Sequence, residues 1–165
     1  MGAEKLDPQT NPLLDKRFVN AFIEATVKTM TLMAQTEVTV GTPSVHQVFQ
    51  STGEVAGTVS LKFGSSQGAV SISFEKEAIF KILENMLGEQ HTEVTDAVAD
   101  AVGELTNQIY GSAKTTLNQM GFDFEMAIPS TIKGSLRIHK EQAVASLKVP
   151  FILAESHFYI DITVA

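Results

Sequence analysis

The chain has 165 residues, of which 44% are hydrophobic, and this favours one domain with a sizeable core. Its net charge is -7 and its basic residues are not clustered, so nucleic acid and anionic membranes are disfavoured as partners. Cysteine is absent, which excludes disulfides and thiol chemistry. No apolar run approaches the ~20 residues that span a bilayer, and the polar start lacks a signal-peptide pattern. We therefore expect a cytoplasmic protein.

The N-terminal part of the chain divides into a polar segment and a helix. Residues 1–12 are polar, and we expect them to be disordered, followed by a single domain over residues 13–165. From Asp15 to Met33 the apolar residues recur at helical spacing, which predicts a first helix.

Alternating apolar residues predict strands in two groups of three. The strands are expected at residues 45–50, 56–63, 70–74, 132–138, 143–153 and 158–164. The glycines and serines of residues 64–68 predict a hairpin connection between two of them. Pro150 indicates an edge or a bulge in its strand, because proline has no backbone N–H to donate.

Two helices are predicted between the strand groups. The first covers residues 75–87 and has Gly88 as a natural C-cap. The second begins near Thr92 or Thr95, either of which is a suitable N-cap, and ends near Met120. The resulting order, α-βββ-αα-βββ, predicts an α+β fold in which helices cover a mostly antiparallel sheet.

The long second helix carries the most informative residues of the chain. At 100° per residue, Asp100, Glu104, Asn107 and Gly111 share one polar face, with Gly103 beside it. The opposite face is apolar and holds Val98, Val102, Leu105, Ile109 and Met120. Two glycines inside a helix cost about 1 kcal/mol each relative to alanine, which suggests that something approaches the backbone closely. Every amphipathic helix has a polar face, however, so the spacing alone does not establish a site.

Methionines also occur in the apolar patterns. We expect them in the core, at positions 30, 33, 86 and 120.

The polar face of this helix resembles the signature helix of the CheC/CheX family of chemotaxis phosphatases. The matching pattern is Asp100-x3-Glu104-x2-Asn107, and Pro129 stands where that family has a proline about 20 residues later. The likeness extends over about residues 15–164. It is closer to CheX-like members, because the chain has one Glu-x2-Asn motif and CheC has two.

The resemblance implies a CheC-like fold and hydrolysis of the aspartyl phosphate of a CheY-like response regulator. Asn107 would orient the attacking water and Glu104 would pair with a lysine of the regulator. Asp100, Gly103 and Gly111 would belong to the partner-binding surface. The resemblance implies that this chain binds no cofactor or metal itself and that Mg²⁺ comes from the regulator. It also allows a homodimer, because CheX-like proteins pair through sheet edges.

Other functions stay open at this point. A protein of the same fold could bind a receiver domain without hydrolysing its phosphate, or act as a scaffold. Asp96, Asp100 and Glu104 stand at four-residue intervals and could touch a divalent ion, although a solvated acidic face is favoured. The four histidines have no spacing typical of zinc ligands.

Overall fold

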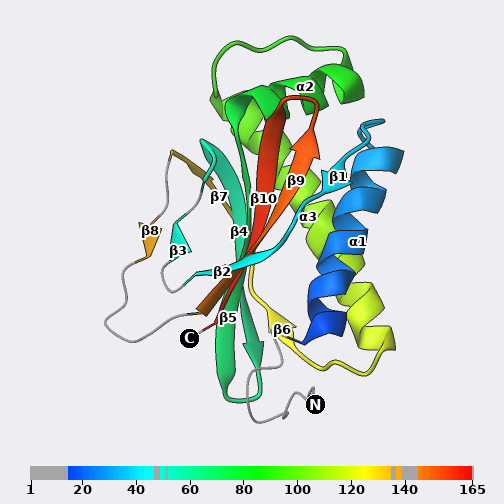
Figure 1. Cartoon of the computed structure of the whole chain (residues 1–165), viewed down its shortest axis with the longest axis vertical. Helices are drawn as coiled ribbons and strands as arrows, with labels where there is room; N and C mark the ends of the chain where they lie inside the picture. Colours follow the sequence, from blue (N-terminus) through cyan, green and yellow to red (C-terminus); the bar gives the residue numbers. More distant parts are fainter. Residues whose placement is uncertain (1–14, 47–48, 51, 135–136, 139–144, 165) are drawn as a thin grey trace.

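The computed structural model describes residues 15–46, 49–50, 52–134, 137–138 and 145–164 (Figure 1). The expected disordered segment, residues 1–12, lies outside these ranges. The helices are α1 (Lys16–Leu32), α2 (Lys76–Leu87) and α3 (Asp96–Gln119). The strands are β1 (Thr39–Val40), β2 (Ser44–His46), β3 (Phe49–Gln50), β4 (Val55–Phe63), β5 (Ser66–Phe74), β6 (Glu125–Met126), β7 (Ser130–Lys133), β8 (Arg137–Ile138), β9 (Ala145–Leu153) and β10 (Ser156–Val164).

The main sheet is antiparallel and is built around two long hairpins. Its strand order is β1-β9-β10-β5-β4-β6, while β2 also pairs with β9 and β7 with β4. The hairpins are β4–β5 and β9–β10, and β5 joins them by pairing with β10. A separate small sheet consists of β3 and β8.

The two faces of the main sheet differ in polarity. The β10 residues Phe158, Ile160 and Ile162 are fully buried and belong to the hydrophobic core, whereas Tyr159 and Asp161 alternate with them on the other face. Helices α1 and α3 lie side by side along the apolar face, and α2 lies at one end of the sheet (Figure 1). The expected α+β class and antiparallel sheet are confirmed.

Several predicted strands have different limits in the structure. The strand expected at 45–50 is divided between β2 and β3, and that expected at 132–138 is divided between β7 and β8. In each case the two described parts pair in different sheets, although the alternation in the sequence is continuous. The hairpin connection is Gly64-Ser65 rather than residues 64–68, and Gly64 adopts φ +61°. Such a tight turn favours glycine at this backbone angle.

Pro150 lies in a strand that is paired on both sides. Along β9, Val40 of β1 is opposite Phe151 and Ser44 of β2 is opposite Lys148. The break between β1 and β2 therefore coincides with Pro150, whose carbonyl accepts a hydrogen bond from the Gly41 N–H at 2.8 Å. The expectation of an edge is wrong, because β9 lies between β10 and the short strands β1 and β2, and Pro150 is placed at the break between those two strands.

The methionine prediction is only partly right. Met30 is buried and Met86 is half-buried, but Met33 and Met120 are 43% and 49% exposed. Both exposed residues are C-caps, of α1 and α3 respectively. A residue at the end of a helix continues the apolar periodicity in the sequence without continuing the packed face.

No helix in the part of the chain that the structure describes is long and apolar enough to cross a membrane.

Candidate functional site on helix α3

Helix α3 begins at a well-defined cap. The Thr95 side chain accepts a hydrogen bond from the Val98 N–H at 3.3 Å, so Thr95 rather than Thr92 is the N-cap. Asp96 follows in the first turn, where the helix dipole favours a negative charge. Its carboxylate pairs with Lys133 of β7, and this hydrogen bond lowers the pKa of Asp96. The first turn of α3 is thus tied to β7.

The inner face of α3 is held against β4 by two close contacts. The buried Tyr110 hydroxyl donates to the Gly57 carbonyl at 2.7 Å, and the Val70 carbonyl is 3.3 Å away. Burial raises the pKa of Tyr110, so this hydroxyl keeps its proton. A Cβ on Gly57 would lie 2.2 Å from Oγ1 of Thr106, so only glycine leaves room for the helix. These contacts fix both the rotation and the depth of α3.

The two helix glycines have different surroundings. A Cβ on Gly103 would lie 2.9 Å from Oγ1 of Thr131, so β7 of the same chain is the close neighbour at this position. Gly111 is exposed, and apart from the adjoining backbone of α3 itself no described atom lies within 4 Å of a Cβ built there. Internal packing therefore accounts for Gly103, whereas nothing in the described structure accounts for Gly111.

The outer face of α3 carries the residues that the sequence singled out. Asp100, Glu104, Asn107 and Gly111 are all exposed. The residues expected on the inner face, Val98, Val102, Leu105 and Ile109, are all buried. Glu104 and Asn107 are one turn apart, so their side chains are neighbours. Neither forms a hydrogen bond or ion pair with a residue that the structure describes, which leaves a carboxylate and an amide available to a partner.

A cleft of about 420 Å³ lies beside this polar face. It is lined by Met33, Met86, Leu87, Asp100, Ala101, Glu104 and Leu105. Nothing in the sequence connects α1 and α2 with the site, because only the tertiary structure brings their C-terminal ends to α3. A second hollow of about 490 Å³, lined in part by Lys62, Gln67 and Glu125, contains none of the expected site residues.

The acidic face of α3 is not arranged as a metal centre among the residues that the structure describes. Asp96, the first of the three carboxylates at four-residue intervals, is paired with Lys133. Within the described ranges, no group of three or more histidine, aspartate or glutamate side chains is arranged to hold an ion.

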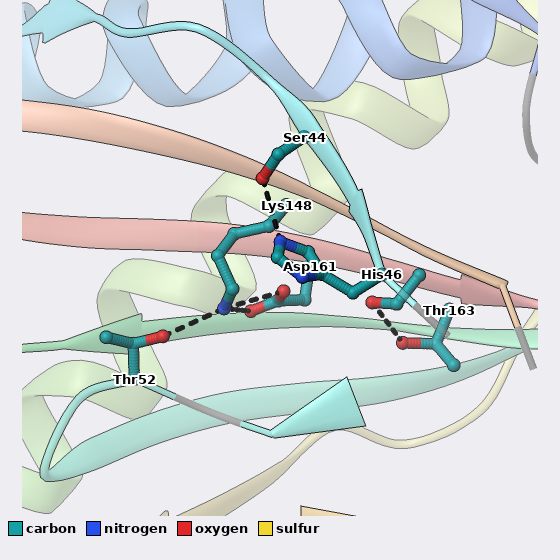
Figure 2. A network of polar contacts seen from close by, with 7 residues as sticks. Ser44, His46, Thr52, Lys148, Asp161 and Thr163 are labelled. Atoms are coloured by element: carbon teal, nitrogen blue, oxygen red, sulfur yellow. Dashed lines mark hydrogen bonds and ion pairs between the residues drawn. The ribbon is translucent and has the colours of Figure 1, made fainter. Parts of the chain in front are cut away.

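A second cluster of charged residues lies on the polar face of the sheet, away from α3 (Figure 2). Lys148 and Asp161 form an ion pair at 2.9 Å, and Lys148 also donates to Oγ1 of Thr52 at 2.9 Å. Asp161 is 1% exposed, and this burial raises its pKa although Lys148 and His46 act in the opposite direction. Because the ion pair joins neighbouring strands β9 and β10, we interpret the cluster as structural.

Comparison with solved structures defines the class of protein. A CheC-like superfamily protein from Shewanella sp. PV-4 is 30% identical and superposes with a TM-score of 0.82, covering 92% of this chain and 99% of its own. A CheX from Borrelia burgdorferi, solved as a CheX-CheY-BeF3-Mg²⁺ complex, is 24% identical and has a TM-score of 0.70, covering 89% of this chain and 97% of its own. The fold is therefore that of the CheC-like superfamily.

Sequence comparison then gives the family. A family model described as chemotaxis phosphatase CheX matches residues 55–152, and the chain belongs to this family. A protein of Thermotoga maritima named CheY-P phosphatase CheX is 23% identical over 153 residues, which cover 92% of this chain and 97% of that protein. The resemblance stated from the sequence is confirmed, and the matched region contains the whole of α3.

Proposed function

We propose that this chain hydrolyses the aspartyl phosphate of a CheY-like response regulator in the cytoplasm. One observation carries the proposal: Glu104 and Asn107 are exposed as neighbours on α3 in a chain of the chemotaxis phosphatase family. The names of the relatives support the choice of partner, since one is a CheY-P phosphatase and another was solved as a complex with CheY.

The proposed chemistry needs little more than positioning. An aspartyl phosphate is an acyl phosphate, so its carboxylate is a good leaving group. A water oxygen forms the new bond to phosphorus, the P–O bond to the aspartate breaks, and inorganic phosphate leaves. The amide of Asn107 has both a donor and an acceptor, so it can hold this water in line with the leaving carboxylate. Catalysis of phosphoryl transfer depends mainly on such positioning and on charge stabilisation.

Glu104 has a different role in the proposal. Its exposed carboxylate pairs with a lysine of the regulator and so sets the position of Asn107 relative to the phosphoryl group. Asp100 and Gly111 extend the partner-binding surface along the same exposed face. Gly103 contributes at the edge of this surface, since it is half-buried beside β7. The regulator supplies Mg²⁺.

The proposal also includes a homodimer. The sheet ends in short strands on both sides, β1 and β2 beside β9 and β6 and β7 beside β4. Strand edges with unpaired backbone groups favour pairing with a second copy. The mass of the protein in solution, measured by sedimentation, tests this part independently of activity.

The test of the activity is the lifetime of a phosphorylated regulator. Wild-type protein should shorten this lifetime, and Asn107→Ala should slow hydrolysis on the order of 10²-fold while still binding the regulator. Glu104→Ala should weaken binding with little change in melting temperature, because the side chain is exposed. Hydrolysis by Asn107→Ala at the wild-type rate would contradict the water-positioning role. Binding of the phosphorylated regulator without faster hydrolysis would instead support the non-catalytic receiver-binding function.

A further inference from the structure

The cleft beside the polar face combines apolar walls with an acidic rim. It is lined by residues at the C-terminal ends of α1 and α2 and in the N-terminal half of α3. Leu105 is buried and forms part of the floor, and Ala101 is half-buried beside it. Asp100 and Glu104 are the two charged residues of the lining.

The apolar walls are unusually exposed for residues that line a hollow. Leu87 is 54% exposed and Met33 is 43% exposed, and both end their helices or lie just beyond the end. Exposed apolar side chains gathered at one place and bordered by polar groups mark an interaction surface. A flexible methionine suits such a surface, because it adapts to the shape of a bound side chain.

We propose that this cleft docks an apolar side chain of the phosphorylated regulator that is flanked by a lysine or arginine on the regulator's surface. The inference rests on the proposed function, because Glu104 belongs both to the cleft and to the pair that would act on the phosphoryl group. The chosen occupant is continuous with that site. Asn107 lies one turn beyond Glu104 on α3, so the cleft and the proposed site are adjacent.

Charge complementarity supports the cation in the occupant. Asp100 and Glu104 stand on the rim, and neither forms an ion pair with a described residue. The apolar walls keep part of the surrounding volume free of water when the cleft is filled, which strengthens attraction between a rim carboxylate and a bound cation. The whole chain carries a charge of -7, which favours approach of a positively charged patch.

The cleft therefore contributes to affinity rather than to the chemical step. Apart from Glu104, which also positions Asn107, its residues contact the regulator equally before and during hydrolysis, so their loss should raise KM and leave kcat unchanged. Asn107 has the opposite signature, a loss of kcat with little change in binding. This difference separates the two sites experimentally.

The chain offers a matched pair of methionines for the test. Met33 and Met120 are both C-cap residues and are 43% and 49% exposed, but only Met33 lines the cleft. A lysine at either helix end is compatible with the helix dipole, so both substitutions should fold. Met33→Lys should raise KM, and the Kd for a beryllofluoride-activated regulator with Mg²⁺, by about tenfold or more. Met120→Lys should match the wild type in both.

A second variant tests the rim. Asp100→Asn preserves the size of the side chain but removes its charge. It should weaken binding at low ionic strength and flatten the dependence of Kd on salt, because an ion pair at an exposed rim is screened.

Each result decides between defined alternatives. If the wild type hydrolyses the phosphate and Met33→Lys has the same KM and Kd as the wild type, the docking site is overturned but the phosphatase proposal stands. Binding without hydrolysis, weakened by Met33→Lys, supports the docking site and overturns the phosphatase. A wild-type protein that neither binds nor hydrolyses the regulator overturns both. Dissociation of a wild-type oligomer by Met33→Lys, seen by sedimentation, would show that a second copy of the chain occupies the cleft and would also overturn the proposal.

Discussion

The Tyr110 hydroxyl gives a quantitative test of how α3 is attached to the sheet. The residue is 1% exposed and donates to the Gly57 carbonyl at 2.7 Å. In Tyr110→Phe this carbonyl loses a hydrogen bond at a site that water does not reach, a change that costs about 1–3 kcal/mol. For a chain of this length each kcal/mol corresponds to roughly 2–4 °C in Tm. The variant should therefore melt about 2–12 °C below the wild type.

The other tyrosine of the chain is a matched control. The Tyr159 hydroxyl is half-buried and lies 3.4 Å from Oε2 of Glu75, a long hydrogen bond. Tyr159→Phe should cost no more than about 0.5 kcal/mol. Urea unfolding of both variants measures the free energies directly, and an unchanged m-value shows that the native fold is retained. The proposed attachment of α3 would be refuted if Tyr110→Phe had the same free energy of unfolding as the wild type, or if Tyr159→Phe lost as much of it as Tyr110→Phe.

Four further substitutions test the charges and the glycines. The Asp15 side chain caps α1, and its hydrogen bond with Arg17 lowers its pKa. Asp15→Ala should therefore reduce the free energy of unfolding by about 1 kcal/mol at pH 7. This difference from the wild type, measured by urea unfolding, should shrink as the pH falls through the folded-state pKa. Burial raises the pKa of Asp161 above 3.8, so the folded protein holds this proton more tightly than the unfolded chain does. The free energy of unfolding of the wild type should therefore fall relative to that of Asp161→Asn as the pH rises from 3.8 through the folded-state pKa. Gly111→Ala should stabilise the protein by about 1 kcal/mol in thermal melts. It should also weaken binding of the regulator if the partner approaches this glycine. Gly103→Ala should gain less stability, because a Cβ there would lie close to Thr131 of β7.

Helix α3 shows how much of the site could be predicted from the sequence. The apolar periodicity placed Val102 and Leu105 inside and Glu104 and Asn107 outside, as the structure has them. This succeeded because a long amphipathic helix on a sheet has only one face to bury. The periodicity did not indicate a function. That came from the resemblance to the CheC/CheX family, which the family comparison confirms, while the roles of Glu104 and Asn107 stay predictions.

What the sequence did not predict depends on contacts between distant segments. Nothing near Met33 or Leu87 in the sequence indicates that they meet beside Glu104, so the cleft could not be found before the fold was known. A glycine at position 103 is expected wherever another group approaches the helix backbone closely, whether from the same chain or from a partner. In the structure this group is Thr131 of β7. The strand limits failed for a related reason, since pairing with different sheets divided stretches whose alternation is continuous.

The arrangement of α3 separates the residues that hold the helix against the sheet from those that are exposed. Tyr110 and Thr106 fix its inner side to β4, so the position of Asn107 is set by packing within the domain and not by the partner. A residue that only orients a water molecule gains most from such rigidity, because an error of about 1 Å in position costs on the order of 10²-fold in rate. The apolar ends of α1 and α2 are instead exposed. Docking by an adaptable cleft next to a rigid amide would therefore let the same catalytic geometry act on a regulator whose surface side chains vary.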